Sequence, residues 1–148
     1  MEKEEVNYNM IDWWKKVMFK NYANFTGRAR RAEYWYFTLF NFLLFIPFYL
    51  IAILGAVDNS LILSTIGFAI FGLYGLAIFL PSLAVTVRRL HDLNKSGWYY
   101  FISFIPFIGS IILLVWLFTD GNRFINNYGN DPKNIIPESF EFEEKKAS

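Results

Sequence analysis

The chain has 148 residues, of which 55% are hydrophobic, 21% are aromatic and only 18% are charged. Soluble domains usually carry about 25% charged residues, so this length suits one domain with more apolar surface than it can bury in water. The composition excludes a disordered protein, and the absence of cysteine excludes a disulfide-stapled fold and a structural cysteine zinc site. A net charge of +1 gives no overall case for nucleic-acid binding.

The first expected element is a helix over residues 10–22 that lies on the membrane surface. Most of its apolar side chains, including two tryptophans, fall on one side of a helical wheel, while Asp12 and three lysines fall on the other. A basic face opposite tryptophan is typical of an interfacial helix beside anionic lipid. Packing on a protein partner, or on the protein's own cytoplasmic loop, is the alternative. Residues 1–9 are expected to form a flexible N-terminus.

Three stretches of 24, 29 and 24 residues without a charged side chain follow. A transmembrane helix needs about 20 mainly apolar residues, and a soluble bundle would need a polar stripe at helical spacing that these stretches lack. The sequence therefore predicts an all-α membrane protein with three transmembrane helices, preceded by the amphipathic interfacial helix. The expected spans are about 35–57, 61–87 and 98–119. The short link at 58–60 predicts an antiparallel hairpin of the first two spans.

The third apolar stretch is interrupted by Pro106, followed by Gly109. Proline removes a backbone hydrogen bond and kinks or breaks a helix. A kinked span is the preferred interpretation. The alternative is a re-entrant segment, in which half-helices 98–105 and 110–118 dip into the membrane and return on the same side. Ser96 is the expected N-cap at the start of this stretch.

The basic residues are unevenly distributed, and their distribution predicts the orientation of the chain. Seven precede the first span, none lies in the 58–60 turn and three lie in the 88–95 loop. Three spans place the N-terminus and this loop in the cytoplasm, with the turn and the tail outside. The re-entrant alternative puts all 14 basic residues inside. Residues 10–133 form the single integral membrane domain, and 134–148 form a flexible charged tail.

Two basic segments beside the spans carry the candidate binding residues. Clustered arginines bind phosphate groups bidentately, although a stop signal with aromatic anchors is the simpler reading. Within the first segment, Glu33 can pair with Arg30 at three-residue spacing. The candidate lipid- or partner-binding residues are Arg28, Arg30, Arg31, Arg88, Arg89, His91, Asp92 and Lys95. The expected interfacial anchors are Trp13, Trp14, Trp35 and Trp98.

Catalytic, metal and cofactor sites are not expected. His91 is the single histidine of the chain, and cysteine is absent. A lone histidine beside one aspartate lacks the ligands that a transition metal needs. A structural, hydrogen-bonded histidine is therefore the favoured interpretation, with a proton-sensing role as the alternative.

Three motifs in order carry a family resemblance. They are GRARRAEYW at 27–35, RRLHDLNKSGW at 88–98 and NNYGNDP at 126–132. Together they resemble domain-of-unknown-function family 805, a group of small bacterial inner-membrane proteins (YhaH-like), over about residues 13–133. The resemblance implies an inner-membrane location and a helical architecture, and it brings no established activity.

These observations favour a non-enzymatic scaffold or accessory protein that binds a partner or anionic lipid through a basic, aromatic cytoplasmic face. The alternative is a component of a small oligomeric transporter or channel, because Gly67, Gly72 and Gly75 allow helices to approach closely. An interfacial enzyme built on His91 is the least favoured hypothesis. The expected partners are the lipid bilayer, including anionic lipid, and a protein partner or further copies of the chain, but no nucleic acid.

Overall fold

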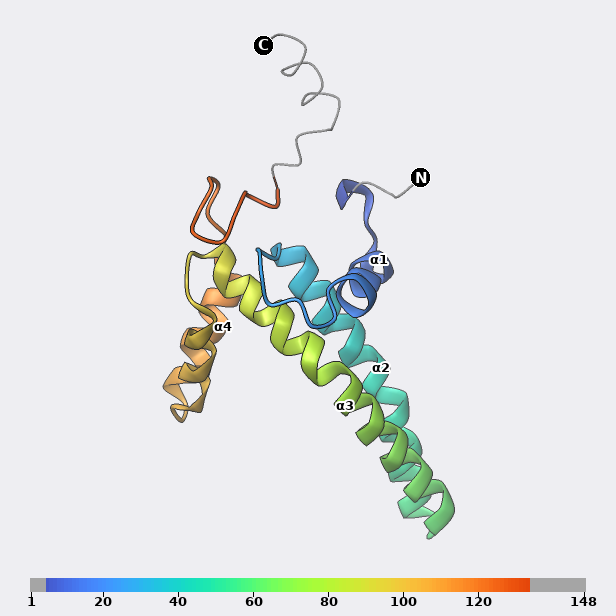
Figure 1. The fold of residues 1–148 in the computed structure, drawn as a ribbon. Coiled ribbons are helices and arrows are strands. Elements are labelled where there is room, and N and C mark those ends of the chain that lie inside the picture. The colour runs from blue at the N-terminus through green and yellow to red at the C-terminus, as the bar shows by residue number, and fades with distance from the viewer. Residues whose placement is uncertain (1–4, 134–148) are drawn as a thin grey trace, which may run out of the picture.

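The computed structural model describes residues 5–133, and every regular element within that range is helical (Figure 1). Residues 1–4 and the predicted charged tail, 134–148, lie outside the described residues. The all-helical prediction is confirmed for the described part of the chain. The elements are η1 (Glu5–Asn7), α1 (Met10–Lys15), the π-helix η2 (Lys16–Lys20), α2 (Arg31–Val57), α3 (Leu61–Asp92), the 3₁₀-helix η3 (Gly97–Phe104) and α4 (Ile108–Phe118).

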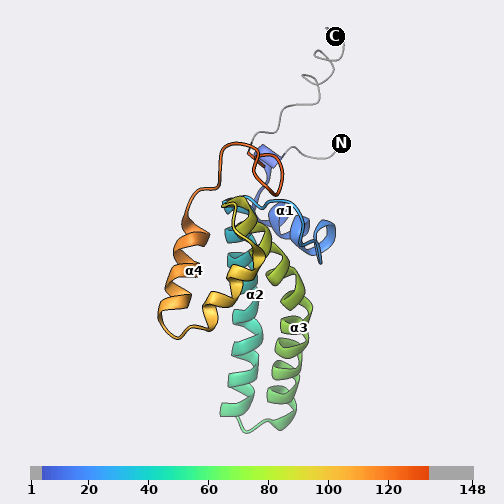
Figure 2. The ribbon, with the colours of Figure 1, turned by 60° about the vertical axis from the view of Figure 1, so that its left-hand side comes forward.

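The two long helices α2 and α3 form the predicted antiparallel hairpin, joined at 58–60 (Figure 2). Ser60 caps α3, since its side chain accepts a hydrogen bond from the backbone N–H of Leu63 at 3.4 Å. Gly67 allows the helices to touch, because a Cβ at this position would lie 2.5 Å from the backbone nitrogen of Ala52. This glycine therefore serves packing within the hairpin.

Helix α3 is longer than the sequence predicted, and this corrects one expectation. The segment 88–92, expected to begin a loop, forms the last turns of α3. Leu90 in this segment is fully buried and packs with Leu113 and Leu117 of α4. Burial of the apolar side chain stabilises the extra turns, although charged residues surround it in the sequence.

The outer surfaces of the hairpin are apolar and largely exposed. Both helices are long and apolar enough to cross a membrane, and only 17% and 6% of the residues in their most apolar windows are buried. The core helix of a soluble protein would be mostly buried. Apolar side chains that face outward along two long helices are typical of contact with lipid.

The third apolar stretch is not one kinked helix. It consists of η3 and α4, which run in opposite directions on either side of a sharp turn (Figure 2). Phe107 forms the turn with φ 63° and ψ −61°, and the N–H of Ile108 donates to the Pro106 carbonyl at 2.7 Å. This is the rare γ-turn. Gly109 then packs directly on the Ile102 carbonyl, where a Cβ would collide.

Both ends of this η3–α4 unit lie beside the same end of the hairpin, opposite the 58–60 turn (Figure 1). Its start follows α3 after a short loop. Its far end is held by a hydrogen bond of 2.9 Å from the Asn122 N–H to the Asp92 carbonyl, and the Trp35 Nε1 lies 3.3 Å from the Leu117 carbonyl. The geometry therefore corresponds to the two half-helices of the alternative interpretation.

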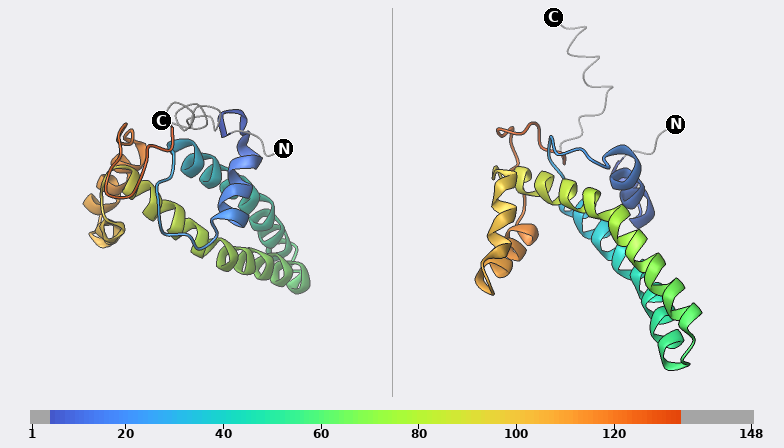
Figure 3. Two further views of the ribbon diagram at one scale, coloured as in Figure 1. Left: turned by 45° about the horizontal axis from the view of Figure 1, so that its top comes forward. Right: turned by 60° about the horizontal axis from the view of Figure 1, so that its bottom comes forward.

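The amphipathic segment α1–η2 lies across the hairpin and packs on it (Figure 3). Val17 is fully buried in a cluster with Ala29, Phe37 and Val85. Trp14 donates a hydrogen bond of 3.1 Å to the Asn41 side chain of α2. The helix thus packs on the protein itself, on α2 and α3, whereas the alternative drawn from the sequence was packing on the protein's own cytoplasmic loop or on a partner.

Candidate functional site

Five charged side chains gather where the ends of α2 and α3 meet, and they form the charged cap. Its members are Arg28, Glu33, Arg88, Arg89 and Asp92. Each is buried, with at most 8% of its surface exposed. Ionised groups at such depth are stable only when they are paired and hydrogen-bonded.

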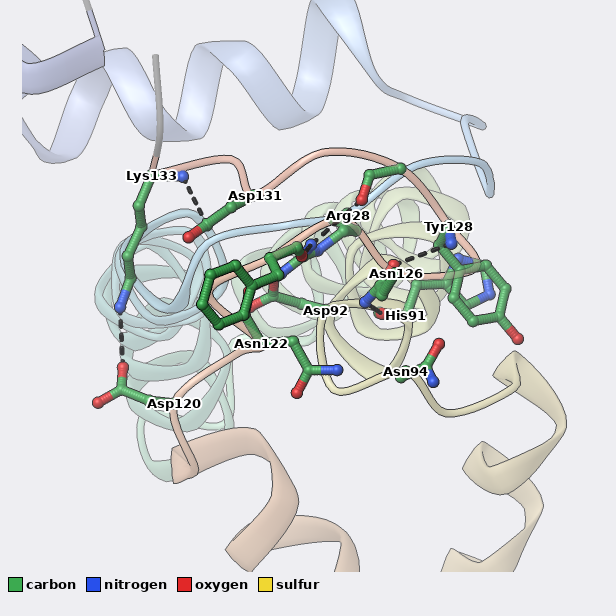
Figure 4. Close-up of polar contacts among 12 residues, drawn as sticks. Arg28, His91, Asp92, Asn94, Asp120, Asn122, Asn126, Tyr128, Asp131 and Lys133 are labelled. Carbon is green, nitrogen blue, oxygen red and sulfur yellow. Dashed lines mark hydrogen bonds and ion pairs between the residues drawn. The ribbon is translucent and has the colours of Figure 1, made fainter. Parts of the chain in front are cut away.

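Asp92 is the centre of one half of the charged cap (Figure 4). Its Oδ1 accepts from the Arg28 Nε at 2.9 Å and lies 2.8 Å from the Arg28 Nη2, while its Oδ2 pairs with Arg89. Gly121 lies against this carboxylate, where a Cβ would collide with it. One carboxylate thus pairs with two guanidinium groups, and the buried carboxylate of Asp131 lies nearby.

The remaining donors of the two arginines hold the chain that follows α4. Arg89 donates to the carbonyls of Leu117 and Thr119, at the C-terminal end of α4, where helix carbonyls lack partners. The Arg28 guanidinium donates to three further carbonyls. These belong to Asn122, Phe124 (2.8 Å) and Gly129 (3.2 Å). The segment after α4 is therefore fastened to α3 through Asp92.

The other half of the charged cap joins α3, α2 and the N-terminal segment. Arg88 Nη1 lies 2.5 Å from Glu33 Oε1, and Lys16 Nζ lies 2.9 Å from Glu33 Oε2. Lys16 also pairs with Glu5 at 2.6 Å. The Nε and Nη2 atoms of Arg88 are buried without a hydrogen-bond partner among residues 5–133. The buried positive charge of Arg88 is therefore compensated by the Glu33 carboxylate.

Four of the eight candidate binding residues, Arg28, Arg88, Arg89 and Asp92, do not form the exposed surface that the sequence suggested. They are the buried charged-cap residues, and their polar atoms are used inside the protein. The physical reason is that the α3 end on which three of them lie is covered by the segments before α2 and after α4. Their side chains are used in contacts within the protein, and the role in binding a partner or a headgroup stays a prediction.

His91 is also buried, at the same end of α3. Its ring stacks on Tyr128, with centroids 3.8 Å apart and planes 5° apart. Its Nδ1 lies 3.1 Å from the Gly27 carbonyl, which can only accept, so Nδ1 carries a proton. Asn126 donates to the His91 carbonyl at 2.9 Å. His91 is thus the hydrogen-bonded histidine that the sequence favoured.

The other three candidates are less buried. Arg31 is half-exposed and pairs with Asp120 at 2.9 Å. Arg30 lies 3.7 Å from Glu5. The Lys95 Nζ lies 4.4 Å from the centroid of the Trp116 ring, within range of a cation–π contact.

The tryptophans expected at the interface have different environments. Trp13 is buried and Trp14 is half-buried, both in the packed α1 segment. Trp35 stacks on Phe118 at 4.1 Å. Trp98 is 78% exposed on η3, and Ser96, as expected, caps this helix by accepting from the Trp98 N–H.

Asp120 is an exposed ion-pair centre outside the long helices. It lies 2.9 Å from both Lys133 and Arg31. The hydrogen bonds from Lys133 and Arg31 lower the pKa of the Asp120 carboxyl from its usual 3.8 to about 2.

Sequence reasoning missed the role of the segment after α4. The sequence predicted no contacts for residues 120–133, yet Asn122, Asn126 and Tyr128 contact the end of α3. For Asn126 and Tyr128 the signal was the third family motif at 126–132, and Asn122 lies outside it. Within residues 5–133, no group of three or more His, Cys, Asp or Glu side chains could hold a metal ion.

Two long apolar helices with outward-facing apolar side chains, and ionised groups paired internally at one end, define a small helical membrane protein. The chain belongs to the family described as protein of unknown function DUF805, whose model matches residues 22–130. It is 47% identical over 125 residues to inner membrane protein YhaI of Escherichia coli K12, covering 83% of this chain and 97% of YhaI. It is 41% identical over 132 residues to inner membrane protein YhaH of the same strain, covering 83% and 98%. No solved structure matches the chain.

Proposed function

We propose that the protein is a non-enzymatic scaffold or accessory protein of the bacterial inner membrane. The observation that carries this proposal is the charged cap. Its ionisable side chains contact one another and backbone carbonyls, and they are buried instead of facing an open cavity. Such an arrangement joins separate segments into a rigid unit, and it occupies the ionisable groups of the charged cap with internal contacts. The names of the relatives YhaI and YhaH support the inner-membrane location.

The proposed topology has α2 and α3 as spanning helices and η3–α4 as a re-entrant unit. Eight residues of 3₁₀-helix extend about 16 Å and eleven residues of α-helix extend about 16 Å, roughly half of a hydrocarbon core of about 30 Å. The end with the charged cap carries the basic residues, while the 58–60 turn carries none. By the positive-inside rule, the end with the charged cap faces the cytoplasm.

A reporter fusion tests this topology. Green fluorescent protein at the C-terminus of the full chain should fluoresce, and alkaline phosphatase at the same place should be inactive, because both ends of η3–α4 are on the cytoplasmic side. Alkaline phosphatase inserted at Asn59, in the 58–60 turn, should be active and serves as the matched control. An active phosphatase at the C-terminus would contradict the re-entrant arrangement and support a third span.

The proposed binding function uses the cations that remain outside the charged cap. Lys15, at the end of α1, and Arg123, after α4, are exposed, and Arg31, at the start of α2, is half-exposed. A basic residue beside an anionic leaflet contributes about 1 kcal/mol of binding. These three side chains therefore favour anionic headgroups at the rim of the protein, in place of the buried arginines.

The corresponding experiment measures how much phosphatidylglycerol copurifies with the full chain from mixed vesicles. The triple variant Lys15→Gln, Arg31→Gln, Arg123→Gln should retain less phosphatidylglycerol than the wild type. The matched control, Lys15→Arg, Arg31→Lys, Arg123→Lys, keeps the charges and should behave as the wild type. Equal retention by all three proteins, with unchanged thermal stability, would rule out headgroup binding at these positions.

A further inference from the structure

An apolar groove separate from the charged cap lies between α3 and η3, and we call it the aromatic groove. Its cavity volume is about 710 Å³, within the usual range for ligand sites. Along α3 its wall is formed by Phe79, Leu83, Val87 and His91. These residues recur every four positions, so they lie on one face of the helix.

The opposite wall is a row of aromatic rings on η3. Trp98, Phe101 and Phe104 recur every three positions, and a 3₁₀-helix has three residues per turn, so the rings lie directly above one another. The ring centroids are 5.5 Å and 5.8 Å apart, and the planes are within 26° of parallel. All three rings are at least half exposed. Because η3 is a 3₁₀-helix, rings at three-residue spacing form a continuous aromatic wall that stays exposed.

Polar groups border the aromatic groove at one end, beside the charged cap. His91, Tyr128 and Ser96 line it there. Because Nδ1 of His91 faces the Gly27 carbonyl, Nε2 is the ring atom left for a ligand. The Ser96 oxygen accepts from the Trp98 N–H, which leaves its hydroxyl proton free to be donated. This end of the aromatic groove therefore offers both hydrogen-bond donors and hydrogen-bond acceptors.

The length of the aromatic groove matches one leaflet of a bilayer. From Phe79 to His91 the helix rises about 18 Å at 1.5 Å per residue, and half of the hydrocarbon core is about 15 Å. An occupant that fits must be apolar over this length and polar at the end beside the charged cap. A phospholipid of the same leaflet has this shape and polarity.

We propose that the aromatic groove binds one phospholipid of the cytoplasmic leaflet. Its acyl chain lies between the α3 row and the η3 row, and its phosphate accepts hydrogen bonds from the hydroxyl groups of Tyr128 and Ser96. This inference rests on the proposed topology, which places the charged cap at the cytoplasmic face. It does not require the anionic headgroup binding proposed for Lys15, Arg31 and Arg123.

The test uses the full chain in phosphatidylcholine vesicles that contain a photoactivatable phosphatidylcholine with a diazirine in its acyl chain. After irradiation, labelled peptides are quantified by mass spectrometry. Labelling should concentrate on residues 79–87 and 98–104. Phe101→Ala removes the middle ring and should lower this labelling roughly tenfold, the change expected when about two methylenes lose their contact. Phe68→Ala is the matched control, because Phe68 and Phe101 are each 52% exposed.

A second pair of variants fills space instead of removing it. Leu83→Trp narrows the aromatic groove and should reduce the labelling of 98–104, whereas Leu76→Trp, on the exposed outer face of α3, should leave it unchanged. Tyr128→Phe keeps the stack on His91 and removes only the hydroxyl group, so it should lower labelling severalfold without changing thermal stability. Equal labelling along all lipid-facing residues, or equal labelling in both members of each pair, would overturn the proposal.

The outcome is separable from that of the proposed function. Vesicles made only of phosphatidylcholine contain no anionic lipid, so site-specific labelling there reports the aromatic groove alone. If labelling is specific while the triple cation variant retains phosphatidylglycerol normally, the aromatic groove is supported and headgroup binding at the rim is refuted. If alkaline phosphatase at the C-terminus is active, the proposed topology is wrong. A photoactivatable lipid placed in only one leaflet at a time then shows which leaflet faces the aromatic groove. Labelling from the leaflet opposite the cytoplasm would overturn the inference.

Discussion

Replacement of Asp92 by asparagine is the most direct test of the charged cap. The variant keeps the shape of the side chain and removes the charge that lies between Arg28 and Arg89. Asp92 is 2% exposed, and both guanidinium groups are buried with it. Two buried cations would then remain without a carboxylate, and water could not reach them to compensate.

The expected size of the effect follows from this burial. Loss of one partner from a buried ion pair usually destabilises a protein by about 3–5 kcal/mol. For a chain of this size, about 1 kcal/mol corresponds to about 2–4 °C in Tm, so Asp92→Asn should lower Tm by on the order of 10 °C. Asp120→Asn is the matched control. It also removes a carboxylate with two cationic partners at 2.9 Å, but Asp120 is exposed, and its loss should shift Tm little.

Two assays check the reasoning. Thermal unfolding in detergent gives Tm, and limited trypsin digestion gives the rate of cleavage after Arg123. Because Arg28 holds the carbonyls of Asn122 and Phe124, cleavage should be faster in Asp92→Asn than in the wild type or Asp120→Asn. Equal Tm values and equal cleavage rates for the two variants would refute the view that the charged cap fastens the segment after α4.

Three further predictions concern the turn and the exposed ion pair. Gly109→Ala should destabilise the protein by about 1–3 kcal/mol in thermal unfolding, because a Cβ collides with the Ile102 carbonyl, whereas Gly72→Ala, which meets nothing within 4 Å, should not. Phe107→Gly should raise Tm, since a glycine relieves about 1 kcal/mol or more of strain at φ 63° and Phe107 is largely exposed. The depressed pKa of Asp120 means that its ion pairs stabilise the fold above pH 3.8 and are lost as the pH falls towards 2. NMR of the Asp120 carboxyl group should show a titration midpoint near 2 in the wild type and a higher midpoint in Lys133→Gln. Equal midpoints in the two proteins would contradict the role of Lys133.

The hairpin was predictable because its signal is local. Uncharged stretches longer than about 20 residues and a three-residue link specify two antiparallel apolar helices before any tertiary contact is known. The break in the third stretch was also visible at Pro106. The direction of the chain after this break could not be predicted. The choice between a kinked helix and a reversal depends on the γ-turn at Phe107 and on the contact of Gly109 with Ile102.

The charged cap could not be predicted from spacing. The sequence suggested that Glu33 pairs with Arg30, but Arg30 is the N-cap of α2 with ψ 155°, so the three-residue rule for helices does not apply to it. Glu33 instead pairs with Arg88, 55 residues away, and Arg28 pairs with Asp92, 64 residues away. Such pairs exist only after the hairpin has brought the ends of α2 and α3 together.

The same arginines can therefore act at two stages. The positive-inside rule depends on basic residues near the ends of apolar segments while the chain inserts, before tertiary contacts form. In the proposed topology, Arg28, Arg88 and Arg89 contribute to orientation at that stage, before they are buried. After folding, carboxylates and carbonyls enclose them, so the final surface is less basic than the sequence implies. The proposed orientation therefore rests on basic residues counted in the unfolded chain, whereas burial removes those three arginines from solvent in the folded protein.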